Sequence, residues 1–283
     1  MTTILDGKTL SMQCKEDIKK QAEALAEMGF RPGMAVVLVG ENPASKVYVR
    51  NKEKDCQECG IYSAMYHLPE ETTEQELLEL LDTLNHDPKI NGILVQLPLP
   101  KQIDSQKVIE AIDPIKDVDA FHPTNVGYLT QGMPRFAPCT PAGIVRLMGA
   151  YHIDPAGKHC VVIGRSNIVG KPMALLLLQR NGTVTICHSG TRDLKAQTLQ
   201  ADILISAVGK TGFVTADMVK DGAVVIDVAM NRNAEGKLCG DVDYPAVAEK
   251  ASAITPVPGG VGPMTRLMLL ENTLTACRLQ NQL

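Results

Sequence analysis

Short apolar runs alternate with amphipathic segments along most of the chain. The apolar runs predict strands at residues 34–40, 61–68, 91–99, 159–164, 183–189, 201–209 and 222–229. Segments with helical periodicity lie between and around them, at residues 9–28, 45–59, 73–85, 140–150, 171–180, 194–200 and 260–280. Near-continuous apolar strands that alternate with helices are typical of parallel sheets covered on both faces. The pattern therefore predicts the α/β fold class.

Proline- and glycine-rich stretches at residues 134–144 and 255–265 divide this pattern. The length of 283 residues exceeds that of a usual single domain, about 100 to 200 residues. We predict an N-terminal α/β substrate domain over residues 1–139, completed by the C-terminal helix 266–283. Residues 140–265 are predicted to form a Rossmann-like, doubly wound parallel sheet, with a cleft between the two domains.

Composition narrows the choice of partners. The net charge of −4 and the pI near 5.9 give no general attraction for nucleic acid or an anionic membrane. No apolar run approaches the roughly 18 residues of a membrane span, and the first residues resemble no targeting signal. We therefore expect a cytoplasmic protein without nucleic-acid or membrane partners. Cys56 and Cys59 have no second cysteine or histidine pair at ligand spacing, so no metal site is predicted.

The stretch VVIGRSNIVGKP, residues 161–172, has the arrangement of a phosphate-binding turn. Gly164 closes a predicted strand and Gly170 opens a helix, which is where doubly wound folds bind dinucleotides. Pro172 suits the first helical turn because its missing N–H has no intrahelical partner there. The usual G-x-G-x-x-G spacing is absent, and Arg165 follows the first glycine directly.

The tip of the next predicted strand, CHSGTRD, indicates which dinucleotide binds. NAD enzymes usually place an Asp or Glu there for the ribose 2′-hydroxyl. Here His188 and Ser189 occupy the tip, and Arg165 lies at the end of the preceding strand. A guanidinium and neutral hydroxyls suit a 2′-phosphate, so the predicted cofactor is NADP.

The first half of the chain carries the candidate chemistry. Tyr48 and Lys52 are four residues apart and share a face of their predicted helix. Y-x-x-x-K is also found in short-chain dehydrogenases, but their nucleotide loop precedes the tyrosine, whereas here Gly164 follows it. A helix with a solvated lysine face is the simpler alternative. Gln96 ends an apolar strand, where open α/β sheets place ligand contacts. Asp117 and Asp119 lie in a loop, where such pairs are commonly turn formers.

Seven motifs in order carry a resemblance to one family: YVRNK, GILVQLPLP, KDVDAFHP, PCTPAG, VIGRSNIVGKP, ITPVPGGVGPMT and ENTL. Over residues 6–277 the chain resembles the bifunctional methylenetetrahydrofolate dehydrogenase/methenyltetrahydrofolate cyclohydrolase family. The resemblance implies NADP-dependent oxidation of 5,10-methylenetetrahydrofolate to 5,10-methenyltetrahydrofolate. It also implies hydrolysis of that product to 10-formyltetrahydrofolate, in one-carbon folate metabolism, by a homodimer.

The resemblance also implies residue roles. Lys52 would be the catalytic lysine, Gln96 would position it, and Tyr48 would pack on the folate rings. The folate site would further include Leu97, Asp119, Pro258, Gly259 and Gly260. The NADP site would include Gly164, Arg165, Ser166, Ile168, Val169, Gly170, Pro172, His188, Ser189, Ala207, Val208, Gly209 and Ala229.

Three positions depart from the family pattern. Ala229 and Met230 stand where the family commonly has Gly and Ile, and an added methyl could crowd the cofactor. Arg266 replaces a usually small apolar residue and opposes the dipole of its helix. Three alternatives stay open: an enzyme with one of the two activities, a non-catalytic NADP-binding protein, and a shikimate-type dehydrogenase.

Overall fold

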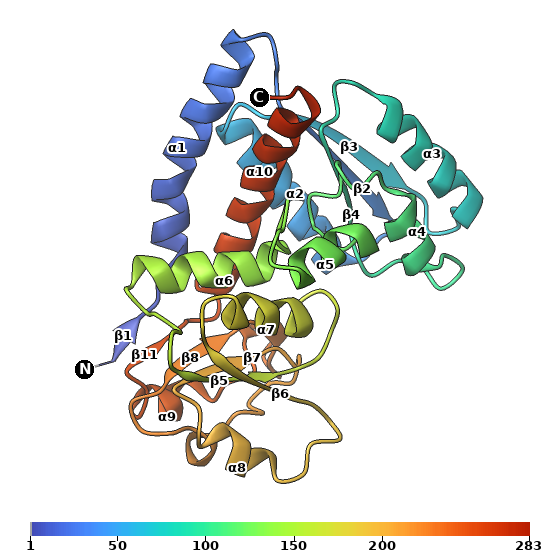
Figure 1. The fold of residues 1–283 in the computed structure, drawn as a ribbon. Coiled ribbons are helices and arrows are strands. Elements are labelled where there is room, and N and C mark those ends of the chain that lie inside the picture. The colour runs from blue at the N-terminus through green and yellow to red at the C-terminus, as the bar shows by residue number, and fades with distance from the viewer. Residues whose placement is uncertain (1) are drawn as a thin grey trace. The chain divides into compact units, whose positions relative to one another are not determined.

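The computed structural model describes residues 2–283, in which two compact units each contain a parallel sheet (Figure 1). One unit comprises Gln13–Cys139 and Arg266–Leu283, and we call it the three-stranded unit. The other, the six-stranded unit, comprises Thr140–Thr265 and the described part of Met1–Met12. Helices α1 (Gly7–Glu27) and α10 (Val261–Gln280) contribute residues to both. The predicted α/β class is confirmed.

The three-stranded unit is built on strands in the order β3-β2-β4, all parallel. Its elements are β2 (Gly33–Val39), α2 (Pro43–Glu58), β3 (Tyr62–Leu68), α3 (Glu74–His86), β4 (Gly92–Val95), α4 (Ser105–Ala111) and α5 (Pro123–Thr130). Helices α3 and α4 lie side by side (Figure 1), and their apolar residues share a core with one face of β2 and β4. On the opposite face of β2, Thr273 Oγ1 of α10 lies 3.6 Å from Met34 Sδ. Because both faces are covered, every residue of β2 is buried.

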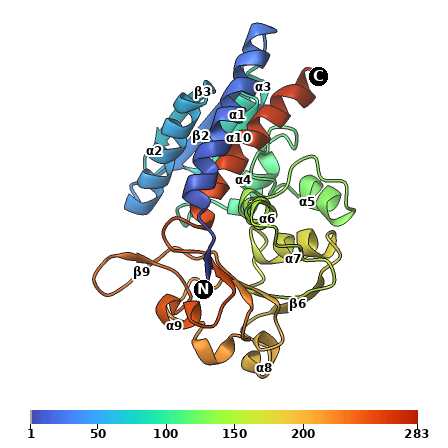
Figure 2. The ribbon, with the colours of Figure 1, turned by 90° about the vertical axis from the view of Figure 1, so that its left-hand side faces the viewer.

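The six-stranded unit has its strands in the order β1-β11-β8-β7-β5-β6, with every neighbouring pair parallel. The strands are β1 (Thr3–Ile4), β5 (His159–Ile163), β6 (Thr183–Cys187), β7 (Ile203–Ser206), β8 (Val224–Asp227) and β11 (Ala253–Ile254). Its helices are α6 (Cys139–Ala150), α7 (Gly170–Leu178), α8 (Leu194–Thr198), a 3-10 turn (Ala216–Met218) and α9 (Tyr244–Ala248). An antiparallel pair, β9 (Asn231–Arg232) and β10 (Leu238–Cys239), lies on a loop that projects from the sheet (Figure 2).

The strand order reverses between β5 and β7, because β6 pairs with one edge of β5 and β7 with the other. Such a switch point is where doubly wound folds bind ligands. Strands β1 and β11 have two residues each, too few for a sequence pattern to reveal them. The pairing of Thr3 with Ala253 is therefore a feature that apolar periodicity does not indicate.

Buried carboxylates end β7 and β8 earlier than the apolar runs predict. The Asp241 carboxylate accepts hydrogen bonds from the backbone N–H groups of Val208 at 2.8 Å and Lys210 at 2.6 Å. At the end of β8, Asp227 accepts from the Ala229 N–H at 3.2 Å. It also accepts from the N–H groups of Asp241 at 3.0 Å and Val242 at 2.8 Å. Burial raises the pKa of Asp227 to about 6 despite these hydrogen bonds. A backbone N–H that bonds to a carboxylate is not available for a hydrogen bond to the neighbouring strand. The strands therefore end here, and the chain turns at the carboxyl edge of the sheet.

A close approach at this edge predicts a large loss of stability in Gly164→Ala. Gly164 has φ +123°, and a Cβ there would lie 2.5 Å from the carbonyl oxygen of Ala207. We expect the substitution to lower the free energy of unfolding by more than about 3 kcal/mol. Gly157→Ala is the matched control, since Gly157 has φ +70° and a Cβ there would have no neighbouring atom of the described residues within 4 Å. This substitution should cost about 1 kcal/mol. Urea denaturation measures both, and equal losses would contradict the steric argument.

Candidate active site

In the three-stranded unit, helix α2 presents the candidate catalytic side chains. Tyr48, Lys52 and Asp55 are spaced four and three residues apart on α2 and therefore share one face of the helix. Tyr48 and Lys52 are partly buried and Asp55 is buried. This spacing of polar residues brings an amine, a phenol and a carboxylate to one surface of α2.

Lys52 reaches the end of β4. Its Nζ donates a hydrogen bond of 2.9 Å to Gln96 Oε1. Gln96 is held in turn, because its backbone N–H donates to the Val37 carbonyl at 2.8 Å and its Nε2 donates to the Leu97 carbonyl at 2.7 Å. Both side-chain contacts require the same orientation of the amide, since an amine bound in this way donates and a carbonyl accepts. The structure thus brings Lys52 of the motif YVRNK together with Gln96 and Leu97 of the motif GILVQLPLP.

Asp119 supplies the negative charge that acts on Lys52. Removal of water by the surrounding protein raises the pKa of Asp119 to about 6, although Lys52 opposes the rise. Loss of solvation also lowers the pKa of Lys52, against the attraction of Asp119. Asp117 has a structural role instead, because its Oδ2 accepts from Asn125 Nδ2 and from the His122 N–H, each at 2.8 Å. The interpretation of the acidic pair as turn formers therefore fits Asp117 and not Asp119.

Cys139, at the start of α6, is a neighbour of this group that sequence reasoning did not single out. Its Sγ donates to the Val118 carbonyl at 3.3 Å, and the thiol is close enough to Asp119 to affect the pKa of that carboxyl group. Burial raises the pKa of the Cys139 thiol well above its usual value, and the charge of Asp119 adds to the rise. A neutral thiol beside Asp119 and Lys52 was signalled in the sequence only by the motif PCTPAG.

Cys56 and Cys59 are buried free thiols. Burial raises their pKa values to about 12 and about 11, respectively. A high thiol pKa opposes both metal ligation and nucleophilic reactivity. Among the described residues, no group of three or more His, Cys, Asp or Glu side chains could hold a metal ion.

In the six-stranded unit, the glycine turn lies at the switch point between β5 and β7. A Cβ on Gly170 would lie 2.2 Å from the carbonyl oxygen of Gly164, so the two glycines allow one tight turn. The Ser166 hydroxyl closes this turn by accepting from the N–H groups of Val169 at 3.2 Å and Gly170 at 3.3 Å. Arg165 and Ile168 are exposed on the turn, and Pro172 is buried in the first turn of α7.

The tip of β6 lies next to this turn. Ile163 and Cys187 are paired residues of neighbouring parallel strands, so Gly164–Arg165 and His188–Ser189 leave the sheet at the same edge. The His188 N–H donates to Thr191 Oγ1 at 2.8 Å, which folds the strand tip into a turn. Ser189 is exposed on it. A guanidinium and a hydroxyl therefore lie on adjacent strand ends.

Two further strand ends complete this edge. Residues 207–209 follow β7, and the Ala207 N–H donates to the Ile163 carbonyl at 2.8 Å. Ala229 follows β8, is buried, and donates its N–H to Asp227 Oδ1 at 3.2 Å. The predicted residues Ala207, Val208, Gly209 and Ala229 thus lie at the carboxyl ends of neighbouring strands.

The loop 258–260 belongs to the six-stranded unit. Gly260 donates its N–H to the Pro256 carbonyl at 2.8 Å, and Gly259 accepts from the Lys8 N–H at 2.8 Å. The assignment of Pro258, Gly259 and Gly260 to the folate site stays a prediction.

Comparisons with known proteins agree with this geometry. The family model described as tetrahydrofolate dehydrogenase/cyclohydrolase, catalytic domain, matches residues 5–119, and the corresponding NAD(P)-binding domain matches residues 138–281. The bifunctional protein FolD of Polaromonas sp. is 62% identical over 271 residues, which cover 96% of each chain.

Two solved structures are similar along the whole chain. One is the bifunctional enzyme FolD, methylenetetrahydrofolate dehydrogenase/cyclohydrolase, from Campylobacter jejuni, with 52% identity, a TM-score of 0.97 and full coverage of both chains. The other is the Trypanosoma brucei N5,N10-methylenetetrahydrofolate dehydrogenase-cyclohydrolase complexed with NADP cofactor and inhibitor, with 35% identity and a TM-score of 0.95; the match covers 100% of this chain and 99% of that one. The alternative of a shikimate-type dehydrogenase is wrong, because the family models match both parts of the chain. The chain belongs to the tetrahydrofolate dehydrogenase/cyclohydrolase family.

Proposed function

We propose how the residues of this chain divide the work of a bifunctional enzyme. The protein is an NADP-dependent methylenetetrahydrofolate dehydrogenase and a methenyltetrahydrofolate cyclohydrolase. It oxidises 5,10-methylenetetrahydrofolate to 5,10-methenyltetrahydrofolate and hydrolyses that product to 10-formyltetrahydrofolate in one-carbon folate metabolism. The observation that carries the residue assignment is the 2.9 Å hydrogen bond from Lys52 Nζ to Gln96 Oε1.

The proposal assigns folate binding and catalysis to residues 1–139 with 266–283, and NADP binding to residues 140–265. Compact units that change at Cys139/Thr140 and at Thr265/Arg266 support these two boundaries. The described residues up to Met12 instead belong to the six-stranded unit, because β1 pairs with β11 there. Lys52, Gln96 and Asp119 all belong to the three-stranded unit, whereas Arg165 and Ser189 belong to the six-stranded unit.

The residues at the switch point fit NADP. Gly164 and Gly170 form a cradle that a Cβ would fill, so the backbone can approach a pyrophosphate closely. Arg165 and Ser189, on adjacent strand ends, would hold the 2′-phosphate through a charge-assisted contact and a hydroxyl donor. Bound NADP supplies the hydride acceptor, and the chain's own residues have only to hold the folate carbon in place.

The hydrolysis step makes a stronger demand on the protein. Water that adds to the cationic bridge carbon must lose a proton, and Lys52 can accept it only as a neutral amine. The lowered pKa of Lys52 favours that form. Because Gln96 accepts one N–H, the amine is oriented while its lone pair stays available for the proton of water. The positive charge of the methenyl substrate would favour neutral Lys52 further.

The remaining folate contacts follow from chemistry and burial. Asp119 offers carboxylate oxygens to the donor-rich edge of a pterin. Tyr48 lies one turn before Lys52 on α2 and would pack on the folate rings, and Leu97 would line the same site. Lys52 with Gln96 supports retention of the hydrolysis activity, and Arg165 with Ser189 supports the use of NADP. These features favour a bifunctional enzyme over one with a single activity.

We also propose a cytoplasmic homodimer that pairs through β6 and the neighbouring apolar surface. Strand β6 is an edge of the six-stranded sheet, and Ile186 and Leu178 are 39% and 59% exposed. An unpaired edge with apolar neighbours suits association with a second copy. Sedimentation equilibrium should give about twice the 30.5 kDa chain mass, and a monomer mass would reject the dimer.

None of the helices in residues 2–283 could cross a membrane.

Lys52→Met tests the role of the amine. We expect the cyclohydrolase kcat to fall about 10²–10⁴-fold, because a general base is lost, while hydride transfer falls less than about tenfold. Stopped-flow absorbance of methenyltetrahydrofolate, followed separately for its formation and decay, measures both steps. Lys54→Met is the matched control, since the Lys54 side chain is 73% exposed on the same helix. An undiminished cyclohydrolase rate in Lys52→Met would contradict the assignment of Lys52 as the general base.

Arg165→Ala tests the 2′-phosphate contact. We expect the KM for NADP to rise about 10- to 100-fold, because a charge-assisted hydrogen bond contributes about 1.5–3 kcal/mol. The KM for NAD should change much less. Arg180→Ala is the control. Arg180 lies just past the C-terminal end of α7, where it donates to the Leu176 carbonyl at 3.2 Å. Steady-state kinetics with both cofactors decides the matter, and an equal effect on the two would contradict the role.

A further inference from the structure

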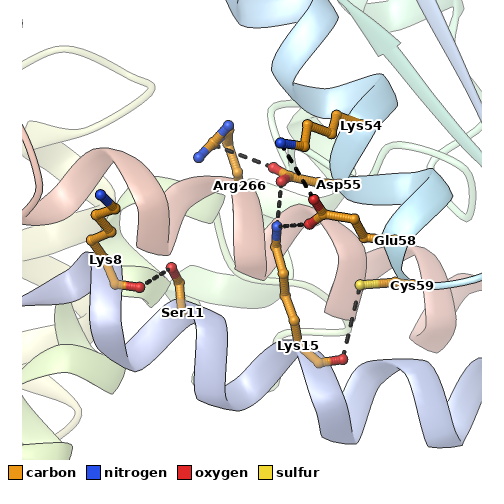
Figure 3. Close-up of polar contacts among 8 residues, drawn as sticks. All are labelled: Lys8, Ser11, Lys15, Lys54, Asp55, Glu58, Cys59 and Arg266. Atoms are coloured by element: carbon orange, nitrogen blue, oxygen red, sulfur yellow. Dashed lines mark hydrogen bonds and ion pairs between the residues drawn. The ribbon is translucent and has the colours of Figure 1, made fainter.

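A buried carboxylate on α2 lies between two cations from other helices (Figure 3). Lys15 Nζ of α1 donates to Asp55 Oδ1 at 2.5 Å and to Glu58 Oε2 at 2.7 Å. Arg266 Nε of α10 lies 3.3 Å from Asp55 Oδ2. The Asp55 side chain is 4% exposed, and its Oδ2 makes no hydrogen bond among the described residues. The ion pair with Arg266 is therefore the contact that balances the charge on this oxygen.

The two carboxylates of the cluster have different cation partners. Asp55 faces Lys15 and Arg266, whereas Glu58 faces Lys15 and the exposed Lys54, which lies 3.7 Å away. Burial of a carboxylate costs several kcal/mol unless cations compensate it. Lys15 is shared with Glu58, so Asp55 needs the second cation. This explains why Arg266 is held near the start of α10, where a positive charge opposes the helix dipole.

The same ion pair places Arg266 beside the catalytic face of α2. Asp55 follows Lys52 by three residues, so the two side chains are neighbours on the helix. The charge of Arg266 acts on both functional groups of this face. It adds to the loss of solvation that lowers the pKa of Lys52, and it opposes the loss of solvation that raises the pKa of Tyr48.

The groups around Lys52 otherwise attract a proton to it. Asp119, from the loop before α5, favours the charged amine, as do Cys139 of α6 and Cys56 of α2 to the extent that they ionise. Gln96 is neutral. Among the charged groups that act most strongly on Lys52, Arg266 is the one that repels the proton. Asp55, which is already paired with Lys15, is not in that set.

We propose that Arg266 is a positioning residue for the hydrolysis step: Asp55 fixes its guanidinium beside Lys52, where it offsets Asp119 and favours the neutral amine. The inference rests on the proposed role of Lys52 as the base that accepts a proton from water. Arg266 itself transfers no proton, since a guanidinium stays charged.

The test is the pH profile of the cyclohydrolase kcat, corrected for spontaneous hydrolysis, in Arg266→Gln. Loss of the cation raises the pKa of Lys52, so the limb on which kcat rises with pH should move up by about 0.5–1 unit. That shift corresponds to about three- to tenfold lower kcat below the limb. The dehydrogenase profile should keep its position, because hydride transfer needs no neutral lysine.

Three further variants make the result specific. Arg266→Lys keeps a cation and should stay within about twofold of the wild type in kcat. Lys54→Gln removes an exposed cation 3.7 Å from Glu58 on the same helix and should shift nothing. Asp55→Asn/Arg266→Gln removes the ion pair as a unit, so it keeps the test valid if Arg266→Gln folds poorly, and its limb should also move up.

The inference is overturned if the limb of both Arg266→Gln and the double variant coincides with that of the wild type, or if Lys54→Gln moves it equally. A parallel loss of dehydrogenase activity would also overturn it, since that indicates a general structural defect. If Lys52→Met has lost hydrolysis while these limbs stay in place, only the role of Arg266 fails. If Lys52→Met retains hydrolysis, the proposed function of Lys52 fails instead.

Discussion

The proposed hydrolysis depends on a Lys52 amine that is removed from water and hydrogen-bonded to a neutral group instead of a carboxylate. Loss of solvation lowers its pKa, and Gln96 accepts an N–H through a neutral amide at 2.9 Å. A carboxylate in the place of Gln96 would stabilise the ammonium form and hold the proton on the lysine. A neutral acceptor orients the amine and leaves its basicity low. Asp119 acts in the opposite direction, because its negative charge raises the pKa of Lys52. The other groups around Lys52 must balance this effect.

The rigidity of that arrangement comes from the sheet. Gln96 follows a strand that pairs in parallel with β2, and its own N–H continues the ladder by donating to Val37. Lys52 comes from the helix that follows β2, so α2 and the end of β4 meet through their side chains. In the six-stranded unit, buried Asp241 and Asp227 likewise bind backbone N–H groups and shape the strand ends next to the glycine turn. Both units use the carboxyl ends of parallel strands to place polar groups.

Much of this could be predicted from the sequence, because parallel strands buried on both faces are continuous apolar runs. The family, the cofactor and the activity followed from ordered motifs, and the relatives agree with them. Contacts between distant residues could not be predicted. Lys52 and Gln96 are separated by two strands, a helix and their loops, and the distance between their side chains depends on sheet register. Arg266 was recognised only as unfavourable for its helix, since its partner Asp55 lies on α2, far from Arg266 in the sequence.

Some residues have roles that a motif cannot distinguish. Ser166 is in the phosphate-binding turn, yet its hydroxyl accepts two N–H groups of that turn and so shapes it. Asp117 and Asp119 form one acidic pair in the sequence, but only Asp119 acts on Lys52. Cys139 was not singled out in the sequence, yet its buried thiol is close enough to Asp119 for the two groups to affect each other's pKa. Side-chain direction, which sets these roles, depends on tertiary packing.

The pKa of Lys52 itself is the most direct measure of this account. An NMR titration of lysine labelled with 13C at Cε, with Lys52→Met to assign the resonance, would follow this amine alone in the folded enzyme. The account predicts that Lys52 titrates below the ordinary lysine value of 10.5, apart from the exposed lysines. A pKa at or above 10.5 would contradict it, because the amine would then be charged at every pH at which the enzyme is active.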